Sequence, residues 1–470
     1  MSFSSPQHQD RSHNSLDTVP PDLFRINNSQ LKDLNLSGNR LKTLPSNFFN
    51  LVRLKKLDLS DNQLVRLSSE LELLAELKEL NVSRNNLSII PENIKSLQKL
   101  KILDISFNSL SSLPSGLVLL SSLQVLRLNN LYLTELLEDL GMLSSLNSLE
   151  MRDNYLTSLP PSTANLSQLT MLDLGNNQLD RLDKALTRCQ ALKELWLDCN
   201  MILELPLEIG NLTKLTFLEL SGNLLEDIPE EISLISPLTH LYLSDNKLAS
   251  LPSSLFSLPS LTVLKLDQNY IKELPPSLFL CTTLQELTIA CNCLRGCPVE
   301  IGSLTSLNYL NLASNKLTCI PSEVGMLEQL CVLNLCHNKI TYIPEEIAGC
   351  SSLTVLDLSC NYLDNLPTTM AGLKLRALWL TENQSKPLPS LQDDIDKVTN
   401  CSVLSCCLLP QNREEHEEEE DWMGETTRLL NLKYSQLKDP NSTSGSELES
   451  SLVSSKKILE RRVQYRWPGS

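Results

Sequence analysis

The chain has 470 residues, a formal net charge of −16 at pH 7 and an aromatic content of only 4%. This acidic balance disfavours nucleic acid and anionic lipid surfaces as partners, because both are polyanionic. No apolar run approaches the roughly 18 residues that a membrane-spanning helix requires. The first residues also lack the basic and apolar regions of a secretory signal peptide. We therefore expect a protein that is neither membrane-spanning nor secreted.

A 23-residue repeat organises most of the chain. The frame L-x-x-L-x-L-x-x-N-x-L starts at Leu31 and recurs without slippage for fifteen copies, and a sixteenth copy begins one residue early at Leu375. The ninth position is asparagine in every copy except the fifth, which has Leu131. This frame is the signature of the leucine-rich repeat. It predicts an α/β fold: a curved solenoid of sixteen 23-residue repeats with a parallel sheet on its concave face.

Each part of the repeat has a structural role. The alternating segment x-x-L-x-L-x predicts a short strand whose leucines enter the core. The amide of the following asparagine can satisfy backbone groups that the turn leaves open. In most repeats a proline follows, as at Pro45, and ends the extended segment before a short helical return on the convex side. Repeats 4 to 7 are expected to be the weakest stretch, because the usual asparagine or proline is replaced there by Leu131, Leu137 and Asp183.

The repeats also set the expected organisation of the chain. We expect a disordered N-terminus in residues 1–15, an N-terminal cap in 16–30, sixteen repeats in 31–396, a C-terminal cap in 397–411 and a largely disordered tail in 412–470. The N-terminal cap resembles the back half of a repeat without its strand, and the segment that closes the array runs from Leu391 to Gln411. The tail combines an acidic run, a serine-rich stretch and a basic end, a composition typical of disorder.

The sequence has no arrangement typical of an active site. It lacks a phosphate-binding glycine loop, a nucleophile elbow and a helical pair of zinc-binding histidines. Three of the 14 cysteines take a repeat position that leucine fills elsewhere, and we interpret them as core residues: Cys189, Cys281 and Cys350. Ordinary surface polarity explains the neighbouring Cys336, His337 and Cys360 better than a metal site. We expect no enzymatic activity, no cofactor and no metal.

Function is therefore expected on the concave face, where repeat positions 3, 5, 7 and 8 project. Across the sixteen repeats these positions hold sixteen acidic and five basic residues, a net charge of −11. A basic protein segment would suit this surface. The alternative interpretation is that an exposed strand face carries charge for solubility alone.

An apolar stripe runs along the second half of the same face. Position 3 carries mostly aromatic or aliphatic side chains in repeats 9 to 16, whereas repeats 1 to 3 have charged ones. Aromatic anchors bordered by acidic residues are typical of protein interfaces. The candidate partner-binding residues are Trp196, Phe217, Glu219, His240, Tyr242, Val263, Tyr309, Val332, Val355 and Trp379. The alternative is that these side chains only pack against one another across strands.

Four segments have a distinctive sequence: Ile90–Lys95, Glu194–Asp198, Leu375–Gln384 and Cys406–Gln411. Together with the number and length of the repeats, they resemble the LAP family of intracellular leucine-rich-repeat scaffolds, to which Scribble, Erbin, Densin and Lano belong. The layout is most similar to the Lano type, which lacks PDZ domains. This resemblance implies a non-enzymatic scaffold in cell polarity and junction signalling, cytoplasmic or held peripherally at the lateral plasma membrane.

Two other functions remain as alternatives. One is a Ras-pathway or phosphatase-complex scaffold, which has the same 23-residue Leu-Pro repeat. The other is a secreted protein or receptor ectodomain, which the missing signal peptide disfavours. We expect a monomer that binds a protein partner through a basic or apolar segment. Any membrane association would be peripheral, through basic tail residues such as Lys456 and Arg462.

Overall fold

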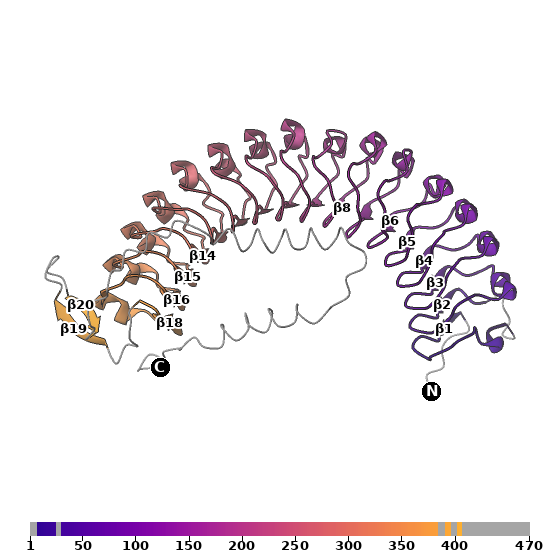
Figure 1. The fold of residues 1–470 in the computed structure, drawn as a ribbon, viewed down its shortest axis with the longest axis horizontal. Helices are drawn as coiled ribbons and strands as arrows, with labels where there is room; N and C mark the ends of the chain where they lie inside the picture. The colour runs from indigo at the N-terminus through magenta and orange to yellow at the C-terminus, as the bar shows by residue number, and fades with distance from the viewer. Residues whose placement is uncertain (1–6, 25–29, 384–390, 396–401, 407–470) are drawn as a thin grey trace, which may run out of the picture.

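The computed structural model describes residues 7–24, 30–383, 391–395 and 402–406. These residues form an open arch, with the strands along its inner side and the short helices along its outer side (Figure 1). The predicted curved leucine-rich-repeat solenoid is confirmed.

The concave side is a single parallel sheet of 17 strands, one more than the sequence predicted. Every strand has three residues, and neighbouring strands pair so that equal repeat positions lie side by side, as in Asp33 opposite Lys56. The strands are β1 (His8–Asp10), β2 (Asp33–Asn35), β3 (Lys56–Asp58), β4 (Glu79–Asn81), β5 (Ile102–Asp104), β6 (Val125–Arg127), β7 (Ser148–Glu150), β8 (Met171–Asp173), β9 (Glu194–Trp196), β10 (Phe217–Glu219), β11 (His240–Tyr242), β12 (Val263–Lys265), β13 (Glu286–Thr288), β14 (Tyr309–Asn311), β15 (Val332–Asn334), β16 (Val355–Asp357) and β18 (Ala377–Trp379).

The convex side consists of short 3-10 helices. They are η1 (Pro21–Phe24), η2 (Ser46–Asn50), η3 (Ser69–Leu73), η4 (Glu92–Ser96), η5 (Ser115–Leu119), η6 (Leu140–Met142), η7 (Pro161–Asn165), η8 (Leu186–Arg188), η9 (Leu207–Asn211), η10 (Glu230–Leu234), η11 (Ser253–Ser257), η12 (Pro276–Leu280), η13 (Val299–Ser303), η14 (Ser322–Met326), η15 (Glu345–Gly349) and η16 (Thr368–Gly372). In the ranges given above, none of the helices has both the length and the apolarity that crossing a bilayer demands.

The leucines of the repeat fill one continuous core between these two layers. The core extends from Val19 near the start of the array to Leu380 in its last repeat. In every strand of the parallel sheet except β1, the central residue points into it, as Leu218 does with none of its surface exposed. Cys189, Cys281 and Cys350 are also fully buried, so the interpretation of these cysteines as core residues is confirmed.

The asparagine at the ninth position connects successive repeats. The side chain of Asn62 accepts a hydrogen bond from the backbone N–H of Leu41 at 3.0 Å. It donates to the carbonyls of Leu36 at 3.0 Å and Leu59 at 3.1 Å. Since the same pattern recurs along the array, these side chains satisfy the buried backbone groups of the turns, as predicted.

Proline determines the length of the convex helix. Pro45 precedes the five-residue helix η2 with φ −71° and ψ 151°, a geometry that proline favours. Where Leu137 and Asp183 replace it, η6 and η8 have only three residues. Repeat 2 keeps five residues without proline, because the side chain of Ser68 accepts a hydrogen bond from the N–H of Glu70 and caps η3.

The N-terminus differs from the expectation. Residues 7–15 are not disordered: β1 pairs in parallel with β2, and the backbone N–H of Arg11 donates to the carbonyl of Asn35 at 2.8 Å. Asn14 then occupies the ninth position of an additional repeat. The described part of the predicted cap, residues 16–24, is therefore the second half of this repeat, and the strand of the repeat is β1.

The C-terminal end is also built differently. β19 (Leu391–Ile395) and β20 (Ser402–Cys406) form an antiparallel pair, and β20 also pairs with β17 (Asn365–Pro367). This separate three-stranded sheet lies at the end of the arch (Figure 1). Residues 391–395 thus belong to the closing segment, as the expected bounds Leu391 to Gln411 have it, and not to the repeats, as the range 31–396 has it. The strand of repeat 16 is β18. The expected tail, residues 412–470, lies outside the described residues.

Candidate binding face

The register of the sheet places the predicted stripe in one row. Phe217, His240, Val263 and Glu286 are direct neighbours on β10 to β13, and Tyr309, Val332 and Val355 continue the row on β14 to β16. Each residue of this row except Glu286 is a predicted partner-binding residue. The same prediction includes Trp196, Tyr242 and Trp379. Apart from the more deeply buried Glu219, the candidates are half-buried at the concave surface.

Four aromatic rings form a cluster on β9 to β11. The ring centroid of Phe217 lies 4.2 Å from that of Trp196 and 5.2 Å from that of Tyr242. His240 completes the cluster, 5.9 Å from Phe217 and 6.2 Å from Tyr242. These residues therefore do pack across strands, while part of each ring stays open to solvent. The Nε1 atom of Trp196 is covered and has no acceptor among the described residues.

Glu219 lies at the centre of this cluster. On the neighbouring strands it pairs in register with Trp196 and with Tyr242. The rings leave Glu219 only 9% exposed, and burial raises the pKa of its carboxyl group. Its Oε1 atom accepts a hydrogen bond from the backbone N–H of Ser221 at 2.9 Å. No described lysine or arginine forms an ion pair with it.

Two further carboxylates beside the cluster are affected by burial. Desolvation raises the pKa of Asp245 and of Asp267. Asp267 accepts hydrogen bonds from the Oγ1 atom of Thr288 at 2.6 Å and the N–H of Ala290 at 2.7 Å. This part of the face therefore holds negative charge that water solvates poorly.

The basic residues of the concave face are occupied within the chain. Lys56 pairs with Glu79 at 2.7 Å, Arg127 with Glu150 at 2.9 Å and Lys265 with Glu286 at 3.4 Å. Arg84 instead lies over the ring of Phe107, 4.5 Å from its centroid. Carboxylates of the chain thus pair with Lys56, Arg127 and Lys265, and acidic residues remain in excess on the face.

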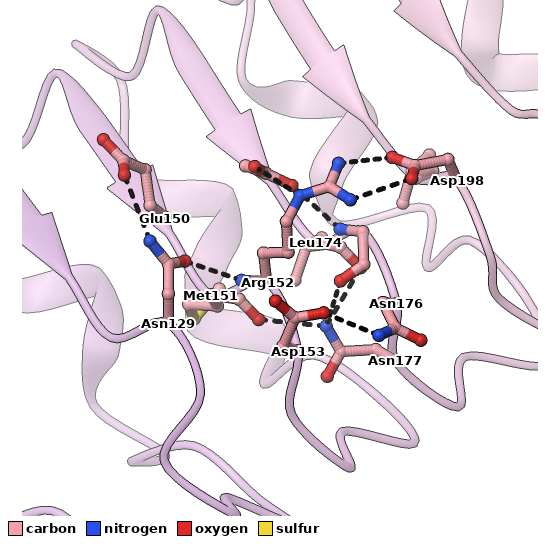
Figure 2. Close-up of polar contacts among 12 residues, drawn as sticks. Asn129, Glu150, Met151, Arg152, Asp153, Leu174, Asn176, Asn177 and Asp198 are labelled. Carbon is pink, nitrogen blue, oxygen red and sulfur yellow. Dashed lines mark hydrogen bonds and ion pairs between the residues drawn. The ribbon is translucent and has the colours of Figure 1, made fainter. Parts of the chain in front are cut away.

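Arg152 has the most extensive contacts of these bases. Its guanidinium forms two hydrogen bonds with Asp198, at 2.9 Å and 2.6 Å, and a third with Asp173 at 3.1 Å. Figure 2 shows the side chain reaching from its own repeat to Asp198, two repeats further along. The carboxylates raise the pKa of Arg152, so it remains charged.

Arg152 is one of the five basic residues predicted on the concave face, but the sequence pattern did not predict this network. Gly175 makes it possible, because a Cβ atom there would lie 2.4 Å from the guanidinium carbon of Arg152. The signal in the sequence was a glycine at repeat position 7, where most other repeats have a bulkier residue. Asp198 is therefore compensated, unlike Glu219.

The far end of the face is more neutral. Position 7 carries small buried residues in repeats 12 to 14, namely Ala290, Ala313 and Cys336. Tyr309 lies three strands from Tyr242, so at about 4.8 Å per strand it is outside the aromatic cluster. Trp379 lies on the last strand of the sheet, beside Asp357. The stripe therefore divides into an acidic aromatic part and an aliphatic part.

The cysteines at this end are not arranged as a metal site. Cys360 donates a hydrogen bond to Glu382 at 3.0 Å, and burial with this carboxylate raises the pKa of its thiol to about 12. Among the described residues, no group of three or more His, Cys, Asp or Glu side chains is placed to hold a metal ion.

Comparison with known protein families assigns most of the array. A leucine-rich-repeat profile matches residues 12–64, 144–202, 236–292, 259–317, 305–358 and 328–384, and together these matches cover more than half of the chain. A second leucine-rich-repeat profile matches residues 76–97 and 99–120.

Several solved structures have the same architecture. A leucine-rich-repeat protein of Leptospira interrogans is 32% identical with a TM-score of 0.74, over 78% of this chain and 95% of that protein. The Toll–Spatzle complex of Drosophila is 27% identical with a TM-score of 0.60, over 75% of this chain and 47% of the matched chain.

A plant structure adds a third comparison. The ectodomain of the receptor kinase GASSHO1/SCHENGEN3 from Arabidopsis thaliana was solved in complex with CASPARIAN STRIP INTEGRITY FACTOR 2. It is 29% identical with a TM-score of 0.54, over 77% of this chain and 51% of the ectodomain. Leucine-rich-repeat domains are typically non-enzymatic modules that bind proteins. On the profile matches and the structural likeness, the chain belongs to the leucine-rich-repeat family.

Proposed function

We propose that this protein is a non-enzymatic intracellular scaffold that binds a protein partner along its concave face. The observation that carries the proposal is the half-exposed cluster of Trp196, Phe217, His240 and Tyr242 among acidic residues. Aromatic side chains provide large contact areas at little cost in conformational entropy, and they are common anchors of interfaces.

The charge of the face supports a basic segment in the partner. Since the bases of the face are engaged within the chain, an approaching protein meets an excess of carboxylates. Such a field accelerates the encounter with a basic segment. The aliphatic row of Val332 and Val355 would then contact an apolar part of the same partner.

The cellular setting is proposed from the resemblance to the LAP family. It favours a role in cell polarity or junction signalling, in the cytoplasm and with peripheral attachment at the lateral plasma membrane. We propose that the chain is a monomer. Structural relatives solved with bound proteins, such as the Toll–Spatzle complex, support a partner-binding role without indicating the compartment.

A Ras-pathway or phosphatase-complex scaffold is the second candidate, because it would use the same concave face. The identity of the captured partner distinguishes the two functions. Junction proteins support the first function, whereas a phosphatase subunit or a small GTPase supports the second.

The proposed face is tested by replacing both Trp196 and Tyr242 with alanine in the full chain. Truncating a buried aromatic anchor commonly costs about 2 kcal/mol or more of binding free energy. Affinity capture from an epithelial lysate, read by mass spectrometry, should therefore lose the partners that the wild-type chain recovers. The melting temperature should change little, because both rings are half-exposed.

Tyr132→Ala is a matched control. Tyr132 also stacks on an aromatic neighbour, Tyr155, with ring centroids 6.2 Å apart, but it lies outside the concave strand positions. This variant should recover the same partners as the wild type. Unchanged recovery by the folded Trp196 and Tyr242 variant would show that partners bind elsewhere.

A further inference from the structure

We propose that the concave face contains a seat for one arginine side chain of the partner, formed by Trp196, Glu219, Gly222, Tyr242 and Asp245. This inference rests on the proposed function and specifies the residue that the partner inserts. We call these five residues the arginine seat.

Glu219 provides the first half of the argument. It is nine-tenths buried between Trp196 and Tyr242, yet no described basic side chain forms an ion pair with it. A buried carboxylate without a counterion costs free energy, so a stable fold alone would favour a neutral residue at this position. Burial raises the pKa of Glu219, which reflects this cost.

Asp245 lies in the next repeat beside the same site. It forms no ion pair with a described residue. Burial and the nearby carboxylates of Asp198, Asp245 and Glu219 raise the pKa of the Cys199 thiol. Asp198 is already bound by Arg152. Glu219 and Asp245, which both act on the Cys199 thiol, form no ion pair of their own with a described residue, and we place the partner's cation between them.

Gly222 leaves room for this cation. It takes the eighth repeat position, between Cys199 in the preceding repeat and Asp245 in the following one, and its φ is +69°. A Cβ atom here would lie 3.2 Å from the Sγ atom of Cys199, so glycine leaves only that thiol at this point of the surface. Asp61 and Asp245 take a similar φ at the same repeat position, so the backbone alone does not require a glycine here.

The aromatic cluster already holds a cation from the chain itself. The Nζ atom of Lys265 lies 4.9 Å from the centroid of Tyr242 and pairs with Glu286 at 3.4 Å. This contact shows that an aromatic ring and a carboxylate of this face act together on an ammonium group. The proposed seat repeats the combination on the Glu219 side. There Lys265 acts on the Glu219 carboxylate only at longer range, since its ion pair is with Glu286.

Arginine fits the seat better than lysine. Its planar guanidinium has five N–H donors and can bond to two carboxylates at once, while its stem packs on aromatic rings. It is also more weakly hydrated than an ammonium group, so its transfer to a half-buried site is easier. The aromatic cluster supplies the surface for the stem.

The test uses a single-arginine peptide, acetyl-Gly-Ser-Arg-Gly-Ser-amide, with the full-length chain. Two control peptides of otherwise identical sequence carry lysine or citrulline, the neutral isostere of arginine, in its place. Saturation-transfer NMR should give a side-chain signal at least fivefold stronger for the arginine peptide than for the citrulline peptide, with lysine in between. Equal signals for arginine and citrulline would overturn the seat, and equal signals for arginine and lysine would overturn its preference for arginine.

A matched pair of variants locates the binding. Glu219→Gln with Asp245→Asn removes two carboxylates from repeat positions 5 and 8, and Asp58→Asn with Asp61→Asn removes two from the same positions of repeat 2. The first pair should reduce the arginine signal to the citrulline level, and the second should leave it unchanged. Equal loss in both would show that binding depends only on the overall charge of the face.

The result is independent of the capture experiment. If the seat variants keep the arginine signal while Trp196 and Tyr242 remain necessary for partner capture, the seat is wrong and the proposed function stands. The substitutions are nearly isosteric, and circular dichroism of each variant verifies the fold.

Discussion

Two kinds of buried polar side chain occur in this protein, one fully hydrogen-bonded and one charged. The asparagines at repeat position 9 are buried polar groups with every contact provided by the backbone, as Asn62 shows. Glu219 is buried to a similar degree, but it forms no ion pair with a described residue. Groups that reduce stability in this way are frequent at functional sites. The contrast is why we place the partner's anchor at Glu219.

The sequence predicted the asparagines but not the burial of Glu219. The role of asparagine follows from its repeat position, which is the same in every copy. The burial of Glu219 depends on three particular neighbours, Trp196, Phe217 and Tyr242, and on how their rings pack. For the same reason the reach of Arg152 over Gly175 could not be read from the strand pattern alone.

The stability of a Glu219→Gln variant tests the cost of this buried charge. Burial raises the folded-state pKa of Glu219 above its unfolded value. Between these two values the folded state binds more protons, so the stability of the wild type falls as the pH rises through them. Glutamine stays neutral, and the variant should melt about 1–3 °C higher at pH 7.5.

The difference in melting temperature between variant and wild type should shrink as the pH is lowered to about 4, below the pKa of a glutamate in the unfolded chain. The wild-type carboxyl group is then protonated and as neutral as glutamine. Thermal melts followed by circular dichroism at both pH values give the comparison. Asp58→Asn is the control, because Asp58 accepts a hydrogen bond from Ser60 at 2.9 Å as Glu219 does from Ser221. A variant that melts below the wild type at pH 7.5 would refute the interpretation.

At the level of the elements, hydrophobic pattern and backbone pairing give different information. The leucine frame located every strand of the parallel sheet except β1, since their inward side chains must be apolar. It missed β1, where Gln9 takes the place of the inward leucine. β1 is held by backbone hydrogen bonds to β2, and this pairing leaves no hydrophobic signature.

The convex helices pack closely at their glycines. A Cβ atom on Gly325 in η14 would lie 2.0 Å from the backbone carbonyl oxygen of Glu346 in η15. Backbone atoms cannot move aside as a flexible side chain can. The approach of these two helices, and with it the local curvature, therefore depends on glycine.

Gly325→Ala should consequently destabilise the array by about 1–3 kcal/mol, as overpacking of a close contact does. Gly372→Ala is the control, because no atom lies within 4 Å of the added Cβ. It should be neutral or slightly stabilising, since alanine restricts the unfolded chain. Urea denaturation of both variants measures the difference, and equal effects would contradict the packing argument.

At the scale of the whole molecule, the solenoid could be predicted because one 23-residue repeat is used again and again in the same register. Each repeat contacts mainly its neighbours, so knowledge of one repeat and its register gives the core of all of them. The ends could not be predicted in this way, because β1 and the sheet of β17, β19 and β20 are each used once. The acidic character of the concave face was likewise evident from composition, whereas its aromatic and aliphatic parts required the structure.

The same nearest-neighbour logic predicts where the array opens first. Repeats 5 and 7 have the shortest convex helices, and Leu131 interrupts the row of asparagines. Local unfolding begins where the fewest contacts hold neighbouring repeats together. In native buffer a protease should leave residues 31–383 intact, and at urea concentrations below the unfolding midpoint the first cuts should fall within residues 131–188.

Leu137→Pro should delay these cuts. The carbonyl of Leu137 accepts a hydrogen bond from the N–H of Leu140 at 3.0 Å, as that of Pro45 does from Phe48 at 2.9 Å, so the local backbone already suits proline. The substitution should stabilise the repeat by about 0.4–1 kcal/mol by restricting the unfolded chain. Mass spectrometry of the fragments over time, with Leu137→Ala as the control, gives the sites and rates. First cuts outside residues 131–188, or equal rates for the two variants, would show that the weakest interface lies elsewhere.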